Sequence, residues 1–278
     1  MELPEAPELE VIRDFLSPRI VGARVVAARV VRPSVLRPLA GDFEMDIVGR
    51  SFESIDRVGK MLLFGLSGDR KVALNMMLSG LLQYSRPGER LLKKTCFVIV
   101  LSSGDELRYL DDKQMGMAYY ATGDQLYGIP RFAGLSGQVP DVLDQLSLAE
   151  LKERLKPLRG EIKGILTRGR VVAGIGNAYA DEILFDARIY PFKKRAELTD
   201  EDLERLRLSM PRVIAEATEE VRRRAGEKIH HKRRDFMKVH RRGGAECPVC
   251  TGRISEVTAN RRVTSYCRRC QPGMLIGN

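Results

Sequence analysis

Four cysteines near the C-terminal end of the chain have the spacing of a metal site. Cys247, Cys250, Cys267 and Cys270 form the pattern C-x2-C-x16-C-x2-C. Each CxxC pair can hold one metal ion with two thiolates, and the residues between the pairs suit a β-hairpin that returns the second pair. Four thiolates complete a tetrahedral shell, so the spacing predicts one structural Zn²⁺ with no open catalytic position. Two disulfides or a chance pattern are the alternatives.

The composition favours a reducing compartment and a polyanionic partner. The fifth cysteine, Cys96, stands alone in an apolar run typical of a buried strand. Two CxxC pairs and one lone cysteine fit a metal site in a reducing cytosol better than they fit a set of disulfides. Lys and Arg outnumber Asp and Glu by 47 to 37, giving a net charge of +10 that favours nucleic acid, with an acidic membrane surface as the alternative. The densest basic stretch, residues 222–242, leads directly into the cysteines. No membrane span or signal peptide is predicted, so we expect a cytoplasmic, nucleoid-associated protein.

The two halves of the chain have different periodicities. The N-terminal half predicts a short helix near Pro7 and then β-branched runs separated by Gly and Asp turns, which indicates an antiparallel sandwich or barrel. From about residue 145 the period is helical, and Ser147 with Glu150 has the pattern of a capping box. Thr199 with Asp202 is a weaker version of this start. Strands are predicted at 20–32, 47–56, 61–66, 71–83, 95–102, 106–110 and 117–121, and helices at 147–155, 159–167, 177–187, 199–207 and 210–228.

Two local features suit a phosphate backbone. Asn260, Arg261 and Arg262 stand at the tip of the predicted cysteine hairpin, where arginines can contact phosphates. Residues 174–177 (Gly-Ile-Gly-Asn) precede a helix and can present backbone N–H groups at its positive end. Taken alone, the second feature is better explained as a tight turn with Asn177 as the helix cap.

Five stretches of the sequence, in order, carry a resemblance to one family. They are residues 4–8 (PEAPE), 59–64 (GKMLLF), 107–111 (LRYLD) with Gly116, 172–182 (VAGIGNAYADE) and the cysteine hairpin. Together they resemble the formamidopyrimidine-DNA glycosylase/endonuclease VIII (Fpg/Nei) family of base-excision repair enzymes. The resemblance implies an α+β multidomain fold. Its parts are an N-terminal antiparallel β-sandwich with a flanking helix (1–131), a linker (132–146), a helix–two-turn–helix DNA-binding domain (147–236) and a four-cysteine zinc-finger β-hairpin (237–278).

The resemblance also implies a chemistry for the N-terminal domain. Pro4 matches the proline whose amine attacks the sugar C1′ of a damaged nucleotide, forming a Schiff base before β,δ-elimination. Glu5 matches the acid/base carboxylate, and Glu8 matches a second carboxylate that supports the site. Lys60 matches a lysine that contacts phosphate and lesion. The chain therefore resembles a bifunctional DNA glycosylase and apurinic or apyrimidinic (AP) lyase.

Further matches concern the DNA. Lys163 and Asn177 match contacts to phosphate or lesion, and Arg262 matches the zinc-finger arginine on the lesion phosphate. Where the family usually has Met, Arg and Phe to fill the gap left by a flipped base, this chain has Leu78, Lys113 and Met115. Lys113 lacks the planar fork of Arg, so recognition of the opposite base is expected to differ. The expected partner is double-stranded DNA with damaged bases or abasic sites, bound by a monomer whose one cofactor is zinc.

The residues before Pro4 depart from the family. An internal proline has an amide nitrogen that cannot attack a sugar, and here Pro4 follows Met1-Glu2-Leu3. Three hypotheses retain catalysis: translation from Leu3, followed by methionine removal, which frees Pro4; the Met1 amine; or Lys60 as nucleophile. The alternative function is a non-catalytic or weakly catalytic binder of damaged DNA. A zinc-ribbon RNA-binding or ribosome-associated protein would explain the charge and the cysteines but not Glu5 or Lys60.

The segment between Phe236 and the first cysteine is short. Family members that excise 8-oxoguanine well tend to carry a longer loop there, which covers the flipped base. The short segment favours formamidopyrimidines, hydantoins, oxidised pyrimidines or abasic sites over 8-oxoguanine.

Overall fold

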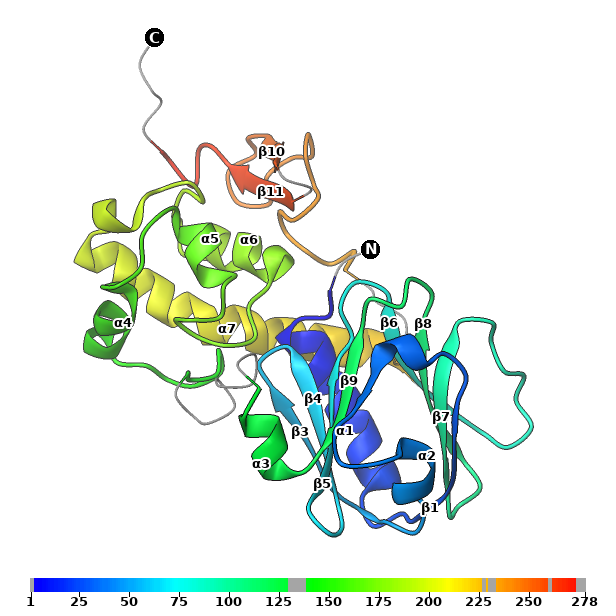
Figure 1. Ribbon diagram of the computed structural model, residues 1–278. Helices are drawn as coiled ribbons and strands as arrows, with labels where there is room; N and C mark the ends of the chain where they lie inside the picture. The colour runs from blue at the N-terminus through cyan, green and yellow to red at the C-terminus, as the bar shows by residue number, and fades with distance from the viewer. Residues whose placement is uncertain (1–2, 130–138, 227–228, 230–233, 260–261, 274–278) are drawn as a thin grey trace. The chain divides into compact units, whose positions relative to one another are not determined.

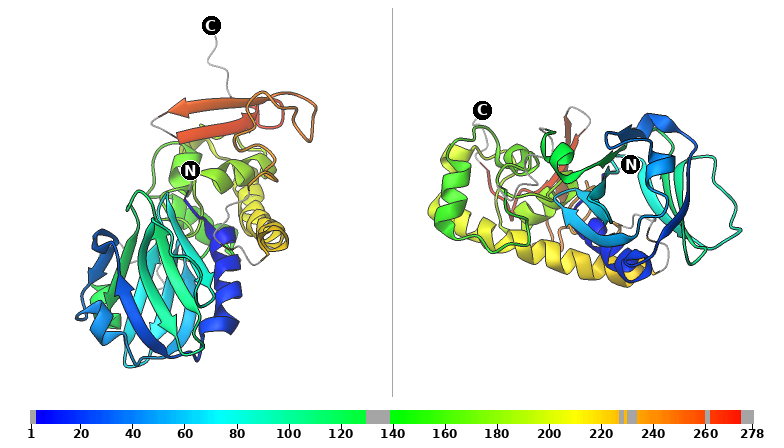
Figure 2. Two further views of the ribbon diagram at one scale, coloured as in Figure 1. Left: turned by 90° about the vertical axis from the view of Figure 1, so that its right-hand side faces the viewer. Right: turned by 60° about the horizontal axis from the view of Figure 1, so that its bottom comes forward.

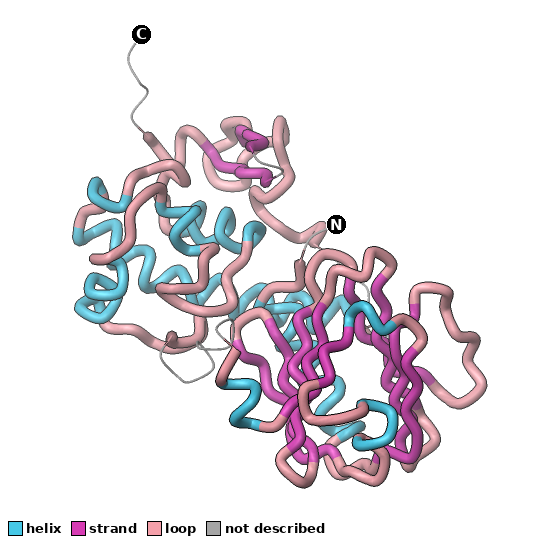
Figure 3. The backbone as a smooth tube through the Cα atoms, in the orientation of Figure 1, coloured by secondary structure: helices cyan, strands magenta, loops and turns pink. Residues whose placement is uncertain are grey.

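The chain forms two compact units in the computed structural model. The structure describes residues 3–129, 139–226, 229, 234–259 and 262–273. Unit 1 comprises Met1–Gln138 with Val221–Lys232, and unit 2 comprises Val139–Glu220 with Arg233–Asn278. Figure 1 labels the elements of each unit, and Figure 3 shows that unit 1 is built mainly of strands and unit 2 mainly of helices and loops.

Unit 1 is a two-sheet β-sandwich. One sheet has the strand order β1-β7-β8-β6 and the other β2-β9-β5-β4-β3, and every pairing is antiparallel except the short parallel pair β2 and β9. The predicted antiparallel sandwich is thereby confirmed. Its elements are α1 (Ala6–Ile20), β1 (Val25–Val30), η1 (Pro33–Val35), β2 (Leu36–Pro38), α2 (Phe43–Asp46), β3 (Phe52–Val58), β4 (Met61–Leu66), β5 (Arg70–Asn75), β6 (Gly80–Ser85), β7 (Thr95–Leu101), β8 (Glu106–Asp111), β9 (Met117–Ala121) and α3 (Gly123–Tyr127).

Apolar side chains from both sheets and from α1 make the core of unit 1. Leu9, Leu16 and Ile20 of α1 are buried in the same cluster as Phe97 of β7. Helix α1 packs on β3 and β4 and lies alongside the strands in Figure 2. Cys96 is fully buried in β7, as its apolar context predicts. Helix α1 is thus fixed along its length, which fixes the position of its first turn.

Some predicted strand bounds in unit 1 were wrong. The expected strand at 71–83 is two strands, β5 and β6, one in each sheet. The chain turns between them because Met77 takes a left-handed φ of 48° and its N–H bonds to Asn75 Oδ1 at 3.1 Å. Methionine and leucine in this turn hid it from a pattern that relies on Gly and Pro. The runs at 20–32 and 47–56 also begin later than predicted, as β1 and β3.

Unit 2 consists of short helices, one long helix and a β-hairpin. Its elements are α4 (Leu148–Leu155), α5 (Ile162–Leu166), α6 (Asn177–Asp186), η3 (Arg195–Glu197), α7 (Asp200–Ala225), β10 (Ile254–Ala259) and β11 (Arg262–Cys267). The last turn of α7, from Val221, belongs to unit 1. Both predicted helix starts are confirmed, because Ser147 bonds reciprocally with Glu150 and Thr199 with Asp202.

Two predicted helices are one. The sequence suggested a break between 207 and 210, but α7 continues through Pro211. Proline removes one helical N–H and normally bends or ends a helix. Here the buried positions Leu206, Met210 and Ile214 recur at helical spacing across it. Packing of that face outweighs the lost hydrogen bond.

The predicted linker contains ordered chain at its end. Asp141 forms an isolated bridge with Ala173, and Val142 is 1% exposed. Residues 139–146 therefore pack with unit 2, whereas 132–138 lie outside the described residues. The helices of the described chain are too short or too polar to cross a membrane.

Asp46 ties α2 to the five-stranded sheet of unit 1. Its carboxylate accepts hydrogen bonds from Arg50 at 2.7 Å, Arg70 at 2.8 Å and Tyr120 at 2.5 Å. Partial burial opposes ionisation, but hydrogen bonds from Arg50, Tyr120 and Arg70 outweigh it and lower the pKa of Asp46 to about 2 from 3.8. Ionised Asp46 therefore stabilises the folded sandwich.

Replacing Asp46 should remove this stabilisation. Because its folded pKa is depressed, the contribution is fully present above the unfolded value near 4 and is lost as pH falls toward about 2. We expect Asp46→Asn to lower the free energy of unfolding at pH 7 by about 1 kcal/mol, after allowance for solvent screening. Urea titrations at pH 7, 4 and 2.5 measure this. The difference should shrink with acid, and the exposed Asp56→Asn should behave like the wild type. A difference independent of pH would contradict the assignment.

Candidate functional site

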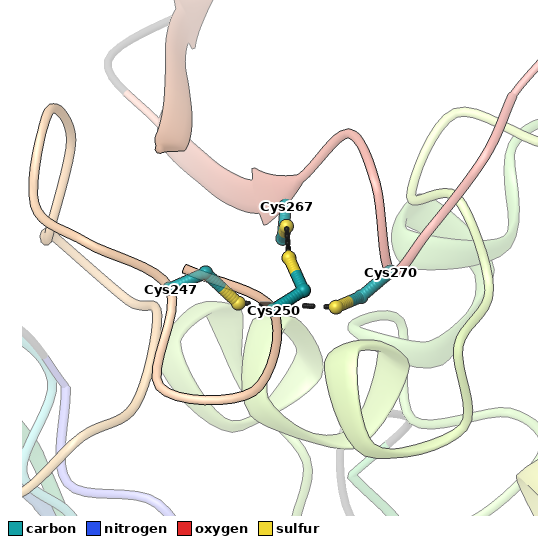
Figure 4. A group of neighbouring side chains, drawn as sticks. All are labelled: Cys247, Cys250, Cys267 and Cys270. Carbon is teal, nitrogen blue, oxygen red and sulfur yellow. Dashed lines mark hydrogen bonds between the residues drawn. The ribbon is translucent and has the colours of Figure 1, made fainter. Parts of the chain in front are cut away.

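The four predicted metal ligands come together in unit 2. Their Sγ atoms all lie within 4.8 Å of one another and point toward a common centre in Figure 4. The pairs Cys247–Cys270 and Cys250–Cys267 are 3.8 and 3.4 Å apart. Sulfurs bound tetrahedrally to one zinc ion at about 2.3 Å would be about 3.8 Å apart, so this donor set fits that ion. All four cysteines are free thiols, and a disulfide framework is therefore not formed.

The hairpin that carries this site packs on α6. Strand β11 lies against α6, and Phe185, Val239 and Ile254 pack with Cys247 and Cys267 in one buried cluster. A metal ion held by the four thiolates would close this small core. This core fixes the base of the hairpin relative to α6.

Lys163 of α5 is held at the hairpin by three oxygens. Its Nζ donates to Val263 O at 2.7 Å and to Thr264 Oγ1 at 2.9 Å, and it pairs with Asp181 Oδ1 at 2.7 Å. The amide of Asn177 also donates to Val263 O, at 2.9 Å. Two of the predicted DNA-contacting residues thus meet on one backbone carbonyl of β11.

These residues line a cleft of about 160 Å³ in unit 2. Lys163, Asn177 and Arg262 contribute to its wall, together with Glu161 and Thr264. The side chain of Arg262 is exposed at the first residue of β11. The cleft places three nitrogen-bearing side chains around a space that a phosphate could enter. The other predicted residues of the hairpin tip, Asn260 and Arg261, lie outside the described part of the chain.

Helix α6 begins differently from the capped turn that Asn177 alone suggested. Gly176 is the N-cap, and Asn177 is the first helical residue. Gly174 has a φ of 103°, which the turn requires and which L-residues rarely adopt. Because Asn177 is not the cap, its side chain is free of that task and reaches β11.

Two buried acidic residues of α6 support this arrangement and were missed as site residues. Asp181, fully buried, accepts His240 Nδ1 at 2.7 Å and the Ser265 N–H at 3.1 Å in addition to Lys163. Glu182 accepts the three consecutive N–H groups of residues 238–240 at 2.8–2.9 Å. They stand in the stretch 172–182, but sequence gives no signal that they face inward.

In unit 1, the predicted catalytic carboxylates close the start of α1. Glu5 is the N-cap, and its N–H donates to Glu8 Oε2 at 2.9 Å. Both side chains are at most 5% exposed, beside the positive end of the helix, which stabilises negative charge. Pro4 and Glu8 line a cavity of about 20 Å³ with Met76, which follows β5, and Gly80, which begins β6. The structure thereby brings Pro4 and Glu8 to the turn that carries Leu78.

Lys60 lies in the two-residue turn between β3 and β4. Gly59 precedes it with a φ of 58°, as the first position of a type II′ hairpin turn requires. Arg57 donates to the Gly59 carbonyl at 2.9 Å and forms an ion pair with Glu10 of α1, both side chains being nearly buried. This ion pair, which sequence analysis missed, connects the Lys60 turn to the helix that carries Glu5 and Glu8.

The residues predicted to fill the DNA stack lie on two loops of unit 1. Leu78 is half-buried in the β5–β6 turn, whereas Lys113 and Met115 are exposed in the loop between β8 and β9. Met115 is 41% exposed, so its apolar side chain is accessible at the surface of this loop. An exposed apolar side chain of this kind suits insertion between bases.

Part of the basic stretch at 222–242 has structural partners within the chain. Arg222 pairs with Asp14 at 2.6 Å, and Arg242 donates to Met237 O at 2.6 Å. The count of basic residues in this stretch is therefore larger than the number of side chains available to bind a polyanion. Residues 227–228 and 230–233 lie outside the described part of the chain.

Comparisons with known proteins agree with both units. Two family models match: the formamidopyrimidine-DNA glycosylase N-terminal domain over residues 3–118 and the formamidopyrimidine-DNA glycosylase H2TH domain over residues 139–226. A formamidopyrimidine-DNA glycosylase of Symbiobacterium thermophilum is 36% identical, covering 97% of this chain and 90% of the relative. Another, of Desulfitobacterium hafniense, is 33% identical, covering 97% of this chain and 100% of the relative.

Solved structures of similar proteins share the fold. The Lactococcus lactis formamidopyrimidine-DNA glycosylase, bound non-covalently to DNA with an AP site, aligns with a TM-score of 0.84 at 24% identity. MutM in complex with DNA containing carbocyclic 8-oxo-G aligns with a TM-score of 0.84 at 26% identity. Each alignment covers 97% of this chain and 100% of the other.

Metal removal should unfold the hairpin and leave the sandwich intact. Structural zinc contributes on the order of 10 kcal/mol to small cysteine sites, and the hairpin core is too small to fold without it. We expect a chelator to open residues 247–270 to trypsin while the strands of unit 1 stay protected, as measured by limited proteolysis with mass spectrometry. Cys270→Ser should reproduce the effect. The matched variant Cys96→Ser should respond to the chelator as the wild type does, and a hairpin that stays protected without metal would exclude the site.

Proposed function

We infer the function from one premise: the chain belongs to the formamidopyrimidine-DNA glycosylase family. We propose that it is a bifunctional DNA glycosylase/AP lyase that removes oxidised bases from double-stranded DNA as a monomer. The observation that carries the proposal is the start of α1. There Pro4, Glu5 and Glu8 are buried, and Pro4 and Glu8 line a cavity at the ends of β5 and β6.

The proposed chemistry assigns one role to each of these residues. A free Pro4 amine would attack C1′ of a nucleotide turned out of the duplex, since C1′ is not reachable in the stack. Glu5 would move protons between sugar and base, and Glu8, bonded to the Glu5 N–H, would hold the helix start in place. Lys60 would contact phosphate and lesion from the β3–β4 turn.

Unit 2 is proposed to hold the DNA backbone. Arg262 is exposed at the cleft that Lys163 and Asn177 line, so phosphate can meet its guanidinium there. The MutM structure at 26% identity, which is bound to DNA containing carbocyclic 8-oxo-G, supports DNA as the partner. We assign the metal as Zn²⁺, which four thiolates favour. Bound zinc would fix the hairpin from which Arg262 projects.

The covalent state of Pro4 decides whether the chain is catalytic. Leu3 precedes Pro4 in the described chain, so the Pro4 nitrogen is an amide there. We favour translation from Leu3 as the route to a free Pro4, with Lys60 or the Met1 amine as the other nucleophiles; Met1 lies outside the described residues. If none acts, the scaffold remains suited to binding damaged or abasic DNA without cleaving it.

Borohydride trapping separates these possibilities. Reduction of the Schiff base on an abasic oligonucleotide links DNA to the attacking nitrogen, and mass spectrometry of the linked peptide identifies it. We expect the chain that begins at Pro4 to be trapped through Pro4 and the full chain to be trapped at least about 100-fold less, because an amide is no nucleophile.

The matched control is Lys60→Ala in both forms. In the chain that begins at Pro4, it should weaken DNA binding without moving the cross-link away from Pro4. A cross-link at Lys60 in the full chain would instead make that lysine the nucleophile. If no form is trapped although all bind abasic DNA, the chain is the non-catalytic binder.

Lesion preference follows from the short segment between Phe236 and Cys247. We propose that formamidopyrimidines, hydantoins and oxidised pyrimidines are better substrates than 8-oxoguanine, because residues 237–246 leave little chain to cover a flipped 8-oxoguanine. Single-turnover excision with the form that is trapped should be at least about tenfold faster for formamidopyrimidine than for 8-oxoguanine, a difference of the size that pocket contacts provide. Equal rates would contradict this preference.

A further inference from the structure

We propose that Asp111 is a positioning residue that locks the two stack-filling loops of unit 1 to each other and so sets the preference for the opposite base. The inference rests on the proposed function, because it assumes that Leu78, Lys113 and Met115 enter the duplex. Asp111 ends β8, immediately before the loop of Lys113 and Met115.

The carboxylate of Asp111 joins both loops directly. Ser79, next to Leu78 in the β5–β6 turn, donates its hydroxyl to Asp111 Oδ1. Gly116, next to Met115, donates its N–H to Asp111 Oδ2 at 2.7 Å. One side chain therefore holds Ser79 and Gly116, which follow Leu78 and Met115. Leu78 and Met115 are called the wedge residues below, because they are proposed to enter the stack. A shift of one loop must move or break a bond to the other.

This carboxylate is fully buried, which makes its bonds costly to lose. Asp111 is 0% exposed, and Tyr109 supplies a third donor through its hydroxyl at 3.2 Å. Burial and the Asp111 charge raise the pKa of Tyr109, which keeps its hydroxyl protonated as a donor. A buried charge that loses donors has no water to replace them, so the loops are held in one arrangement.

Two glycines show how tightly the loops close on this pair. A Cβ atom added at Gly116 would lie 1.7 Å from Tyr109 Oη, and one added at Gly80 would lie 2.3 Å from the same atom. Any side chain at either position would push its loop away from Asp111. Gly80 and Gly116 thus let both loops reach one buried polar centre.

The backbone beside each wedge residue is also in an unfavourable conformation. Met77, before Leu78, has a φ of 48°, and Gln114, between Lys113 and Met115, has a φ of 52°. Such conformations in residues other than glycine persist where surrounding bonds hold them. The bonds to Ser79 and Gly116 supply that constraint in both loops.

The consequence for recognition is a fixed spacing between Leu78 and the Lys113–Met115 pair. Lys113 has a flexible stem and a point charge, so its own side chain cannot fix where it meets the opposite base. A backbone held by Asp111 can fix that position. Loss of the bonds to Asp111 should therefore reduce the differences in affinity among the four opposite bases and leave contacts to the DNA backbone unchanged.

Binding of the full chain to duplexes with a tetrahydrofuran abasic analogue tests this without any cleavage. Each duplex carries the analogue opposite one of the four bases, and an undamaged duplex reports backbone contacts; anisotropy gives each Kd. We expect Asp111→Asn to keep its Kd for undamaged DNA within about twofold. Its preference for the abasic analogue over undamaged DNA, measured as the ratio of the two Kd values, should fall about tenfold. The differences in Kd among the four opposite bases should also become smaller, as expected for lost charge-assisted bonds.

The matched control is Asp105→Asn, at the residue immediately before β8. Asp105 likewise accepts a tyrosine hydroxyl, from Tyr84 at 2.8 Å, and a serine hydroxyl, from Ser103 at 3.1 Å, but it touches neither loop. It should retain both the preference and the spread. If Asp111→Asn does not fold, Ser79→Ala, which removes one of the three donors, should show the same narrowing in smaller degree.

Three results would overturn the inference. A folded Asp111→Asn that keeps the spread, or that weakens binding to damaged and undamaged duplexes equally, makes Asp111 only structural. The same holds for Ser79→Ala where it is the deciding variant. A wild-type chain that does not prefer the abasic analogue would instead overturn the proposed function, and this inference with it.

Discussion

A carboxylate taken out of water must be surrounded by hydrogen-bond donors, and this constraint organises the segments that carry the candidate site. Glu10 is paired with Arg57 beneath the Lys60 turn. Asp111 collects donors from both stack-filling loops. In unit 2, Asp181 and residues of β11 together hold the ammonium group of Lys163. In each case the acidic group lies inside and holds a residue or loop that is proposed to meet DNA.

This arrangement separates two kinds of positive charge. Lys163 is nearly buried and its charge is balanced by Asp181, so it contributes direction more than net attraction. Arg262 is exposed at the rim of the same cleft and adds to the long-range attraction of the basic chain. Arg222, although it belongs to the densest basic stretch, is paired with Asp14. Net charge therefore predicts the class of partner. The positions of the carboxylates within the protein decide which Lys and Arg side chains are available to bind that partner.

The sequence predicted most of the fold because its signals were local. Strand runs between Gly-Asp turns, two helix starts and the cysteine spacing each depend on a few neighbouring residues, and all appear in the structure. Failures arose where packing overrode local preference. The turn at Met77 contains no glycine or proline, and α7 continues through Pro211 because its apolar face stays buried. The buried carboxylates Glu5 and Glu8 were identified only through the family resemblance. Asp111 and Asp181 were not identified, since pattern alone does not tell an inward carboxylate from an outward one.

The start of α1 shows how far the scaffold is independent of the nucleophile. The helix is closed by Glu5 and Glu8, and it is anchored through Glu10 to Arg57, all on the C-terminal side of Pro4. None of these bonds uses the Pro4 nitrogen. A chain that begins at Pro4 and one that continues through Leu3 can therefore share the same buried carboxylates and the same Lys60 turn. The difference between a lyase and a binder is then confined to one covalent bond, and the geometry of the site is compatible with both.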